Sequence, residues 1–101
     1  MPKAYLIIDA VIRDPAKFRE YAMTNAKLVE KMGGRYLVVG GGEVAALEGA
    51  NFAGRAVVSE WDSREAALAY WNSAEYAEVK KLRAGICDAR VTLVDGVAPQ
   101  T

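Results

Sequence analysis

The sequence predicts a single α+β domain, a ferredoxin-like sandwich in which helices cover one face of an antiparallel four-stranded sheet. The order of segments carries this prediction, because strand-like and helix-like stretches alternate as β-α-β-β-α-β, with the second helix divided in two. Length supports it, since 101 residues suffice for one hydrophobic core and not for two. We expect residues 1–97 to form the domain and residues 98–101 to be a C-terminal tail.

Residues 4–12, AYLIIDAVI, predict the first strand, because their side chains divide into two faces with a period of two. One face is uniformly apolar and suits the side that the helices cover. The opposite face is mixed and contains Tyr5, Ile7, Asp9 and Val11. The apolar face consists of Ala4, Leu6, Ile8, Ala10 and Ile12.

The first helix has clear start and stop signals. Asp14 is the predicted N-cap and Pro15 the first-turn proline, and apolar residues recur at helical spacing until Gly33 and Gly34 end the helix. Two further strands follow, at residues 36–39 and 55–61. We expect the first and third strands of the chain to be central in the sheet.

The second half of the chain predicts a divided helix and a last strand. Ser63 and Ser73 are each expected to cap a short helix, the second of which extends to Ile86. Residues 89–94, ARVTLV, alternate and predict the last strand.

Residues 40–49, GGGEVAALEG, formally match the glycine-rich fingerprint of dinucleotide-binding proteins. That fingerprint requires a helix after the glycines, and the run to Gly49 is too short for the crossover helix of a βαβ unit. We therefore expect a bend here, followed by a short edge strand around Val44 to Leu47 and a turn from Gly49 to Gly54.

Composition excludes several functions. Thirteen basic and thirteen acidic residues cancel, so we expect neither nucleic acid nor an anionic membrane as a partner. The sequence contains no histidine and one cysteine, Cys87, which removes Ser-His and Cys-His catalytic pairs and the usual zinc and haem ligands. We expect no metal and no cofactor. The lack of a signal peptide or a membrane-spanning run predicts a cytoplasmic protein.

Helices cover only one face of such a sheet, which leaves the opposite face with large apolar side chains. Tyr5, Ile7 and Val11, with Val58 of the third strand, would lie there. Leaving such groups in water costs roughly 1.5 to 3 kcal/mol each. We therefore expect two copies to pack sheet against sheet as a homodimer.

Four stretches resemble a known bacterial family. They are DPAKFREYA, GGRYLVVGG, RAVVSEWDSREAALAYWNSAEY and DARVTLVDG, and together they span nearly the whole chain. They are similar to the family called domain of unknown function 1330, which belongs to the dimeric α/β-barrel superfamily. This resemblance implies a ferredoxin-like dimer. It also implies cofactor-free oxygenation of phenols or related small-molecule chemistry as one activity, whereas the haem-degrading members of the superfamily use a histidine that is absent here.

Two carboxylates are candidate catalytic groups on the face opposite the helices. Asp9 or Glu60 could act as a general base toward an acidic phenol or enol held between the two sheets. Alternatively, each pairs with Arg90 or Arg55 and fixes the register of the strands.

A further set of residues could contact such a ligand. Aromatic residues at these spacings also suit a hydrophobic core, and Arg35 also suits a solvated strand start. The candidate substrate-binding residues are Tyr5, Arg35, Tyr36, Trp61, Trp71 and Arg90, with Tyr70 as a further aromatic neighbour. The sequence therefore leaves two functions open: a small-molecule enzyme, or a non-catalytic ligand-binding or structural homodimer.

Overall fold

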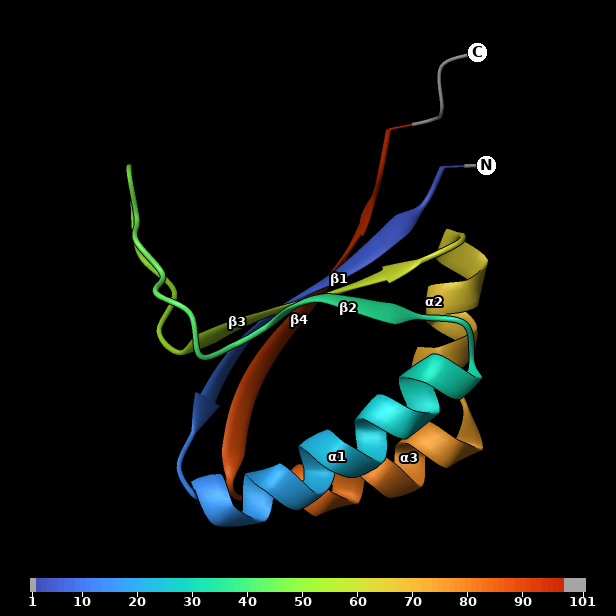
Figure 1. Cartoon of the computed structure of the whole chain (residues 1–101), viewed down its shortest axis with the longest axis horizontal. Helices are drawn as coiled ribbons and strands as arrows, with labels where there is room; N and C mark the ends of the chain where they lie inside the picture. The colour runs from blue at the N-terminus through green and yellow to red at the C-terminus, as the bar shows by residue number, and fades with distance from the viewer. Residues whose placement is uncertain (1, 98–101) are drawn as a thin grey trace.

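The computed structural model describes residues 2–97 and shows a curved four-stranded sheet with helices on one side (Figure 1). The predicted tail at residues 98–101 lies outside the described residues. The elements in chain order are β1 (Ala4–Ile12), α1 (Pro15–Lys31), β2 (Arg35–Val39), β3 (Arg55–Trp61), α2 (Arg64–Trp71), α3 (Ala74–Lys80), the 3₁₀-helix η1 (Lys81–Arg83) and β4 (Cys87–Asp95).

The sheet has the strand order β2-β3-β1-β4 and is antiparallel throughout, which confirms the ferredoxin-like fold and the central position of β1 and β3. Tyr5 lies opposite Glu60 of β3, and Asp9 lies opposite Arg90 of β4. Because side chains alternate along a strand, these residues share the face turned away from the helices. We call it the open face, and we call its opposite the helix-side face.

Polar N-caps start the three α-helices, as the sequence predicts. The side chain of Asp14 accepts a hydrogen bond from the Lys17 amide, and Ser63 and Ser73 accept equivalent bonds at the starts of α2 and α3. The last helix is shorter than expected, because α3 ends at Lys80 and continues only as η1. Gly85 adopts a positive φ of 78°, so the chain turns there and Ile86 lies outside the helix.

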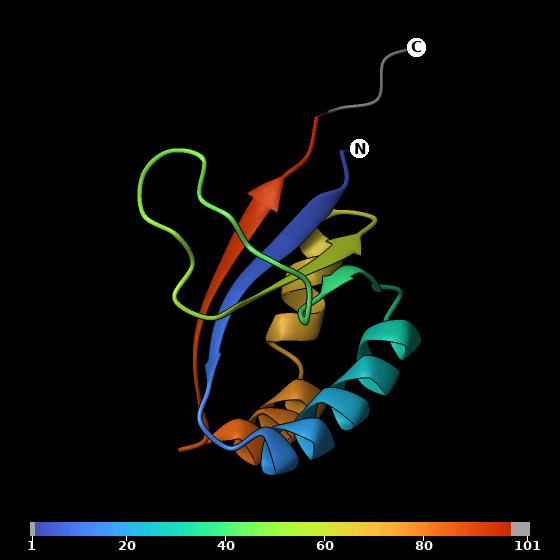
Figure 2. The ribbon, with the colours of Figure 1, turned by 60° about the vertical axis from the view of Figure 1, so that its left-hand side comes forward.

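Residues 40–54 form a long loop without a strand, so the expected edge strand at Val44 to Leu47 is wrong. Gly40 and Gly41 have φ values of 78° and 81°, which turn the chain away from β3, and Leu47 is 97% exposed. Figure 2 shows the loop projecting from the body of the molecule between β2 and β3. The absence of a helix in this segment confirms that the glycine-rich match has no dinucleotide-binding context.

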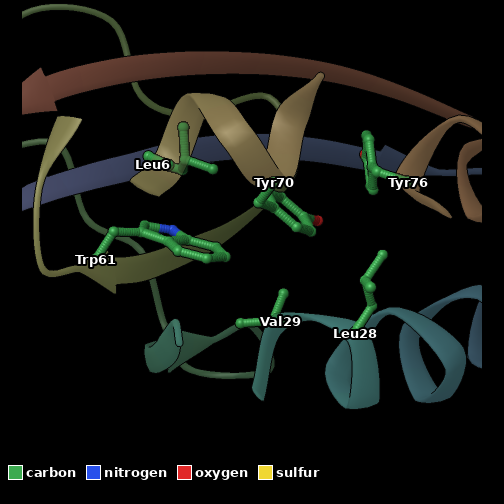
Figure 3. Close-up of a cluster of buried hydrophobic side chains, with 7 residues drawn as sticks. Leu6, Leu28, Val29, Trp61, Tyr70 and Tyr76 are labelled. Atoms are coloured by element: carbon green, nitrogen blue, oxygen red, sulfur yellow. The ribbon is translucent and has the colours of Figure 1, made fainter. Parts of the chain in front are cut away.

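The hydrophobic core lies between the helix-side face and the helices. Trp61 is fully buried at its centre, and its ring stacks on Tyr70 with a centroid distance of 4.7 Å. Tyr70 in turn lies beside Tyr76, as Figure 3 shows. Leu28 and Val29 of α1 approach this row from the other side. The aromatic row therefore joins the sheet to all three helices.

Candidate functional site: a cavity on the helix-side face

A cavity of about 140 Å³ lies between the helix-side face and α1. The sheet contributes apolar side chains such as Leu6, Ile8 and Val91. The exposed Ala22 and Ala26 of α1 also line it, so the cavity reaches the surface beside this helix. Its walls are mostly apolar, which is typical of sites for small organic ligands.

A hydrogen-bonded cluster of tyrosines forms the polar part of the cavity wall. We call it the tyrosine cluster, and at its centre is Asn25, a buried amide in the middle of α1. The Tyr70 hydroxyl donates to Asn25 Oδ1 at 2.7 Å, and Asn25 Nδ2 donates to the Tyr36 hydroxyl at 3.0 Å and more weakly to the Tyr21 hydroxyl at 3.4 Å. The Tyr21 and Tyr76 hydroxyls are 3.0 Å apart. Four separate elements therefore bring their polar groups to one place.

Burial raises the pKa values of three tyrosines of this cluster. Desolvation, the largest cause, raises the pKa of Tyr36 to about 12 and also raises the pKa values of Tyr21 and Tyr70. At neutral pH each hydroxyl therefore keeps its proton and serves as a hydrogen-bond donor or acceptor. None of the three is suited to act as a general base.

Arg83 of η1 is the only charged residue that lines the cavity within the part of the chain that the structure describes. Its Nη2 lies 3.5 Å from the Tyr76 hydroxyl, and its guanidinium lies 5.7 Å from the centre of the Tyr21 ring. No carboxylate of residues 2–97 forms a salt bridge with it. The cavity thus has one positive charge and no acidic group.

Both predicted catalytic carboxylates lie on the open face, and each accepts hydrogen bonds from an arginine and from other donors. Asp9 accepts hydrogen bonds from the backbone amides of Ala53 and Gly54 at 3.0 and 2.8 Å, and from Arg90 at 3.1 Å. These bonds, led by the one from Ala53, lower the pKa of Asp9 despite its burial. Asp9 therefore fastens the end of the long loop to the sheet and pairs β1 with β4.

Glu60 is engaged in the same way at the other end of the open face. Arg35 Nε donates to Glu60 Oε1 at 2.6 Å, and the Tyr5 hydroxyl donates to Oε2 at 3.0 Å. The bond from Arg35 is the largest cause of a lowered pKa at Glu60. A general base works best with a pKa near the working pH, so these lowered values favour the structural interpretation of both carboxylates. The partners are Arg90 and Arg35, and not Arg55.

A second hollow of about 280 Å³ lies over the open face, bounded by Ile7, Asp9, Phe52, Arg90 and Thr92. It is larger than the helix-side cavity, but only one face of the sheet and Phe52 of the long loop bound it. Its two ionic groups, Asp9 and Arg90, already neutralise each other. A ligand here would compete with an existing ion pair, which makes the helix-side cavity the stronger candidate.

The structure divides the sequence-predicted site residues between the two faces. Tyr36 and Trp71 line the helix-side cavity, while Asp9 and Arg90 line the hollow on the open face. Trp61 is fully buried, and its indole Nε1 donates to Ser59 Oγ at 3.0 Å, so it belongs to the core. Tyr5, Arg35 and Glu60 form the separate group described above. The predicted residues therefore do not converge on one site.

Sequence reasoning missed the residues that complete the tyrosine cluster: Tyr21, Asn25, Tyr76 and Arg83. One signal was present, because Asn25 follows Tyr21 by four residues and therefore lies on the same helical face. A buried amide on the apolar stripe of a helix requires hydrogen-bonding partners, which here are Tyr36 and Tyr70 from two other elements and Tyr21 of α1 itself.

Within residues 2–97, no helix is long and apolar enough to cross a membrane. The same residues contain no group of three or more acidic, cysteine or histidine side chains that could hold a metal ion.

The fold and the cavity define a small ferredoxin-like α+β protein with an aromatic-lined cleft between its layers. The chain belongs to the family described as domain of unknown function (DUF1330), whose model matches residues 3–97. No curated protein matches the sequence.

Solved structures share this fold at low sequence identity. One is RPA0582 of Rhodopseudomonas palustris, a protein of unknown function (15% identity, 97% of this chain and 85% of that chain covered, TM-score 0.74). Another is SnoaB of Streptomyces nogalater, a cofactor-independent oxygenase (12% identity, 100% and 97% covered, TM-score 0.65). A third is a dimeric ferredoxin-like protein of unknown function from Thermobifida fusca (15% identity, 94% and 92% covered, TM-score 0.55).

Proposed function

We propose that the protein binds a small molecule with one aromatic ring, such as a phenol or a related enol, in the helix-side cavity. The observation that carries this proposal is an apolar cavity with one hydrogen-bonding wall, the tyrosine cluster. Aromatic walls from Tyr36 and Trp71 suit a flat ligand, and the hydroxyls offer it a defined polar end.

Size limits the ligand. A cavity of about 140 Å³ is close to the roughly 150 Å³ of an engineered apolar cavity that binds benzene. It is well below the roughly 300 to 1,000 Å³ of pockets for drug-sized molecules. One ring with small substituents therefore fits, and a fused polycyclic molecule requires the cavity to open further beside α1.

We propose further that the bound molecule undergoes oxygenase-like chemistry without a cofactor. The similarity of fold to SnoaB supports it by analogy. In such chemistry the electron-rich substrate itself reacts with dioxygen. The protein would bind the ring, orient it and exclude water from it.

The alternative is a non-catalytic ligand-binding protein. One observation favours it: among the described residues, the cavity contains no carboxylate, and its tyrosines have raised pKa values. A substrate in this cavity would therefore have to ionise without a side chain that acts as a base.

We also propose that two copies associate through the open face. Tyr5, Ile7, Val11 and Val58 are each half-buried in the single chain, and Val94 beside them is 40% exposed. A second sheet would cover these groups, and the ferredoxin-like protein from Thermobifida fusca, which is described as dimeric, supports the association of two copies. The Ile7→Lys variant should be monomeric in sedimentation, while Leu68→Lys on α2 should sediment like the parent protein. A monomeric parent protein would refute the dimer.

Binding can be tested with single-ring phenols, by their quenching of tryptophan fluorescence and by isothermal calorimetry. Ala22→Trp should abolish binding, because Ala22 lines the mouth of the cavity, while the fold should survive because the position is exposed. Met23→Trp is the matched control: it adds the same side chain one residue further along, at a position 61% exposed that does not line the cavity.

The outcomes separate the candidates. Loss of binding in Ala22→Trp alone supports the helix-side site, whereas unchanged binding in this variant refutes it. Consumption of dioxygen by the bound phenol, without added metal or cofactor, supports the oxygenase. Binding without consumption supports the non-catalytic alternative.

A further inference from the structure

We propose that the polar group of the ligand is an oxyanion, and that the guanidinium of Arg83 and spare hydroxyl protons of the tyrosine cluster bind it. A phenolate, an enolate or a carboxylate on a single ring meets this description. The inference rests on the proposed function, because it specifies which molecules the same cavity selects. The evidence for an oxyanion is the number of hydrogen-bond donors and charges in the cavity wall.

The amide of Asn25 uses both of its protons within the cluster. Its oxygen accepts the Tyr70 proton at 2.7 Å, and its nitrogen directs its two protons toward Tyr36 and Tyr21 at 3.0 and 3.4 Å. These bonds fix the orientation of the amide. Tyr36 therefore acts as an acceptor toward Asn25, and its own proton is not used in that bond.

Two hydroxyl protons remain spare. The Tyr36 proton has no acceptor among residues 2–97, and in the Tyr21–Tyr76 pair only one of the two protons lies between the oxygens. Arg83 also directs an N–H toward Tyr76, which makes the Tyr76 oxygen an acceptor. The cluster thus has more protons to donate than it has partners, and a ligand that supplies acceptor oxygens would complete it.

Charge favours an anionic ligand over a neutral acceptor. Arg83 is partly buried, lines an otherwise uncharged cavity and has no salt-bridge partner within the described residues. The cations of Lys80 and Arg83 lie over the Trp71 and Tyr21 rings, so the charges that stack on the aromatic wall are positive. Hydrogen bonds from charged donors to an oxyanion are stronger than neutral ones, and low-dielectric surroundings strengthen them further.

This arrangement also replaces the missing base. A bound phenol would ionise because the cavity stabilises its anion, and its proton would leave to solvent through the mouth beside Ala22. The cavity would therefore lower the pKa of a bound phenol. The net effect on the wall tyrosines is the opposite, because desolvation is the largest cause of their raised pKa values and at Tyr21 outweighs the lowering by Arg83.

The test uses 4-nitrophenol, whose phenol and phenolate forms absorb at different wavelengths, and 4-nitroanisole, which keeps the ring and the nitro group and has no ionisable proton. The phenolate should bind the full-length protein about tenfold or more tightly than the phenol, so that the absorbance titration of bound 4-nitrophenol shifts to lower pH. Arg83→Met should remove this preference, so that it weakens phenolate binding by a clearly larger factor than 4-nitroanisole binding. Tyr36→Phe should reduce the preference by a smaller factor.

Arg64→Met is the control of equal charge change, because Arg64 is exposed on α2 and pairs with Asp95 away from the cavity. It should leave both ligands unaffected. Equal binding of phenol and phenolate to the parent protein, or an unchanged preference in Arg83→Met, would overturn this inference. If 4-nitroanisole still binds the parent protein in that case, the proposed function stands. If neither ligand binds the parent protein, the proposed function itself is refuted for single-ring aromatics.

Discussion

The two faces of the sheet carry polar groups of different kinds. On the open face, Asp9 and Glu60 are each paired with an arginine and with further donors. On the helix-side face, the polar groups of the tyrosine cluster are neutral hydroxyls and one amide. Arg83 beside them has no salt-bridge partner among the described residues. The carboxylates of the open face have arginine partners within the chain, whereas Arg83 in the helix-side cavity has no salt-bridge partner among the described residues, so an anionic ligand would gain more in the cavity.

The two faces should also contribute differently to the stability of the fold and to ligand binding. The ion pairs of the open face hold strands and the long loop together, so changing them should affect folding and not the ligand. The tyrosine cluster lies next to the core and lines the cavity, so its residues should affect both. The following variants test this division, in order of decreasing expected effect.

The largest loss of stability should follow Trp61→Ala, because Trp61 is fully buried between the sheet and Tyr70. Truncating a buried tryptophan costs about 3 to 5 kcal/mol of the free energy of unfolding. Urea denaturation measures this loss. Trp71→Ala is the control, since Trp71 is only partly buried and should cost clearly less. Equal losses in the two variants would contradict the assignment of Trp61 to the core and Trp71 to the cavity wall.

Alkaline pH should destabilise the tyrosine cluster. The pKa of Tyr36 is raised from 10.0 to about 12 in the folded state, so its stabilising contribution is fully present below pH 10 and is lost as the pH rises toward 12. At one pKa unit per roughly 1.4 kcal/mol, the contribution is at most about 3 kcal/mol. Thermal unfolding between pH 8 and 12 should show a shallower decline for Tyr36→Phe. Identical pH profiles would show that Tyr36 is not buried as described.

Removing the central amide should have a moderate effect. Asn25→Leu leaves the buried Tyr70 hydroxyl without its acceptor, which costs about 1 to 3 kcal/mol. Adding Tyr70→Phe should recover part of this loss, because the unsatisfied hydroxyl is then gone. A double-mutant cycle by urea denaturation measures the coupling. Strictly additive losses would mean that the two side chains do not depend on each other.

The smallest effect on binding should come from the open face. Asp9→Asn weakens the hold on Ala53 and Gly54, so limited proteolysis should cleave the loop at residues 40–54 faster. Acid should have a similar effect on the parent protein: the pKa of Asp9 is lowered by folding, so its contribution is present above its unfolded pKa and is lost as the pH falls through the folded value. Phenol affinity at neutral pH should not change. A large loss of phenol affinity in Asp9→Asn would indicate that the ligand binds on the open face and not in the helix-side cavity.

Much of the fold follows from the sequence, because its signals are local. The alternation of residues 4–12 and the caps Asp14, Ser63 and Ser73 define elements that the structure confirms. In the segment after Gly40, only the edge strand expected at Val44 to Leu47 is wrong, since the composition of this stretch suits a strand and only the tertiary placement of the loop decides whether a partner strand lies beside it.

The candidate site is less predictable for a physical reason. Its polar wall combines residues from α1, β2, α2, α3 and η1, and no spacing in the sequence indicates that Tyr36 or Tyr70 meets Asn25. The pairing of Asp9 with Arg90 was foreseeable, because both were expected on one face of neighbouring strands. Sequence reasoning therefore identified the charged groups of the open face and missed most of the cavity on the other side.

A crystal structure of the protein with bound 4-nitrophenol would show directly which face of the sheet binds the ligand. We predict the ring between α1 and the sheet, with its phenolate oxygen within hydrogen-bond distance of Arg83 and of a hydroxyl of the tyrosine cluster. A ring bound over Ile7 and Arg90 on the open face, with the helix-side cavity empty, would contradict the account.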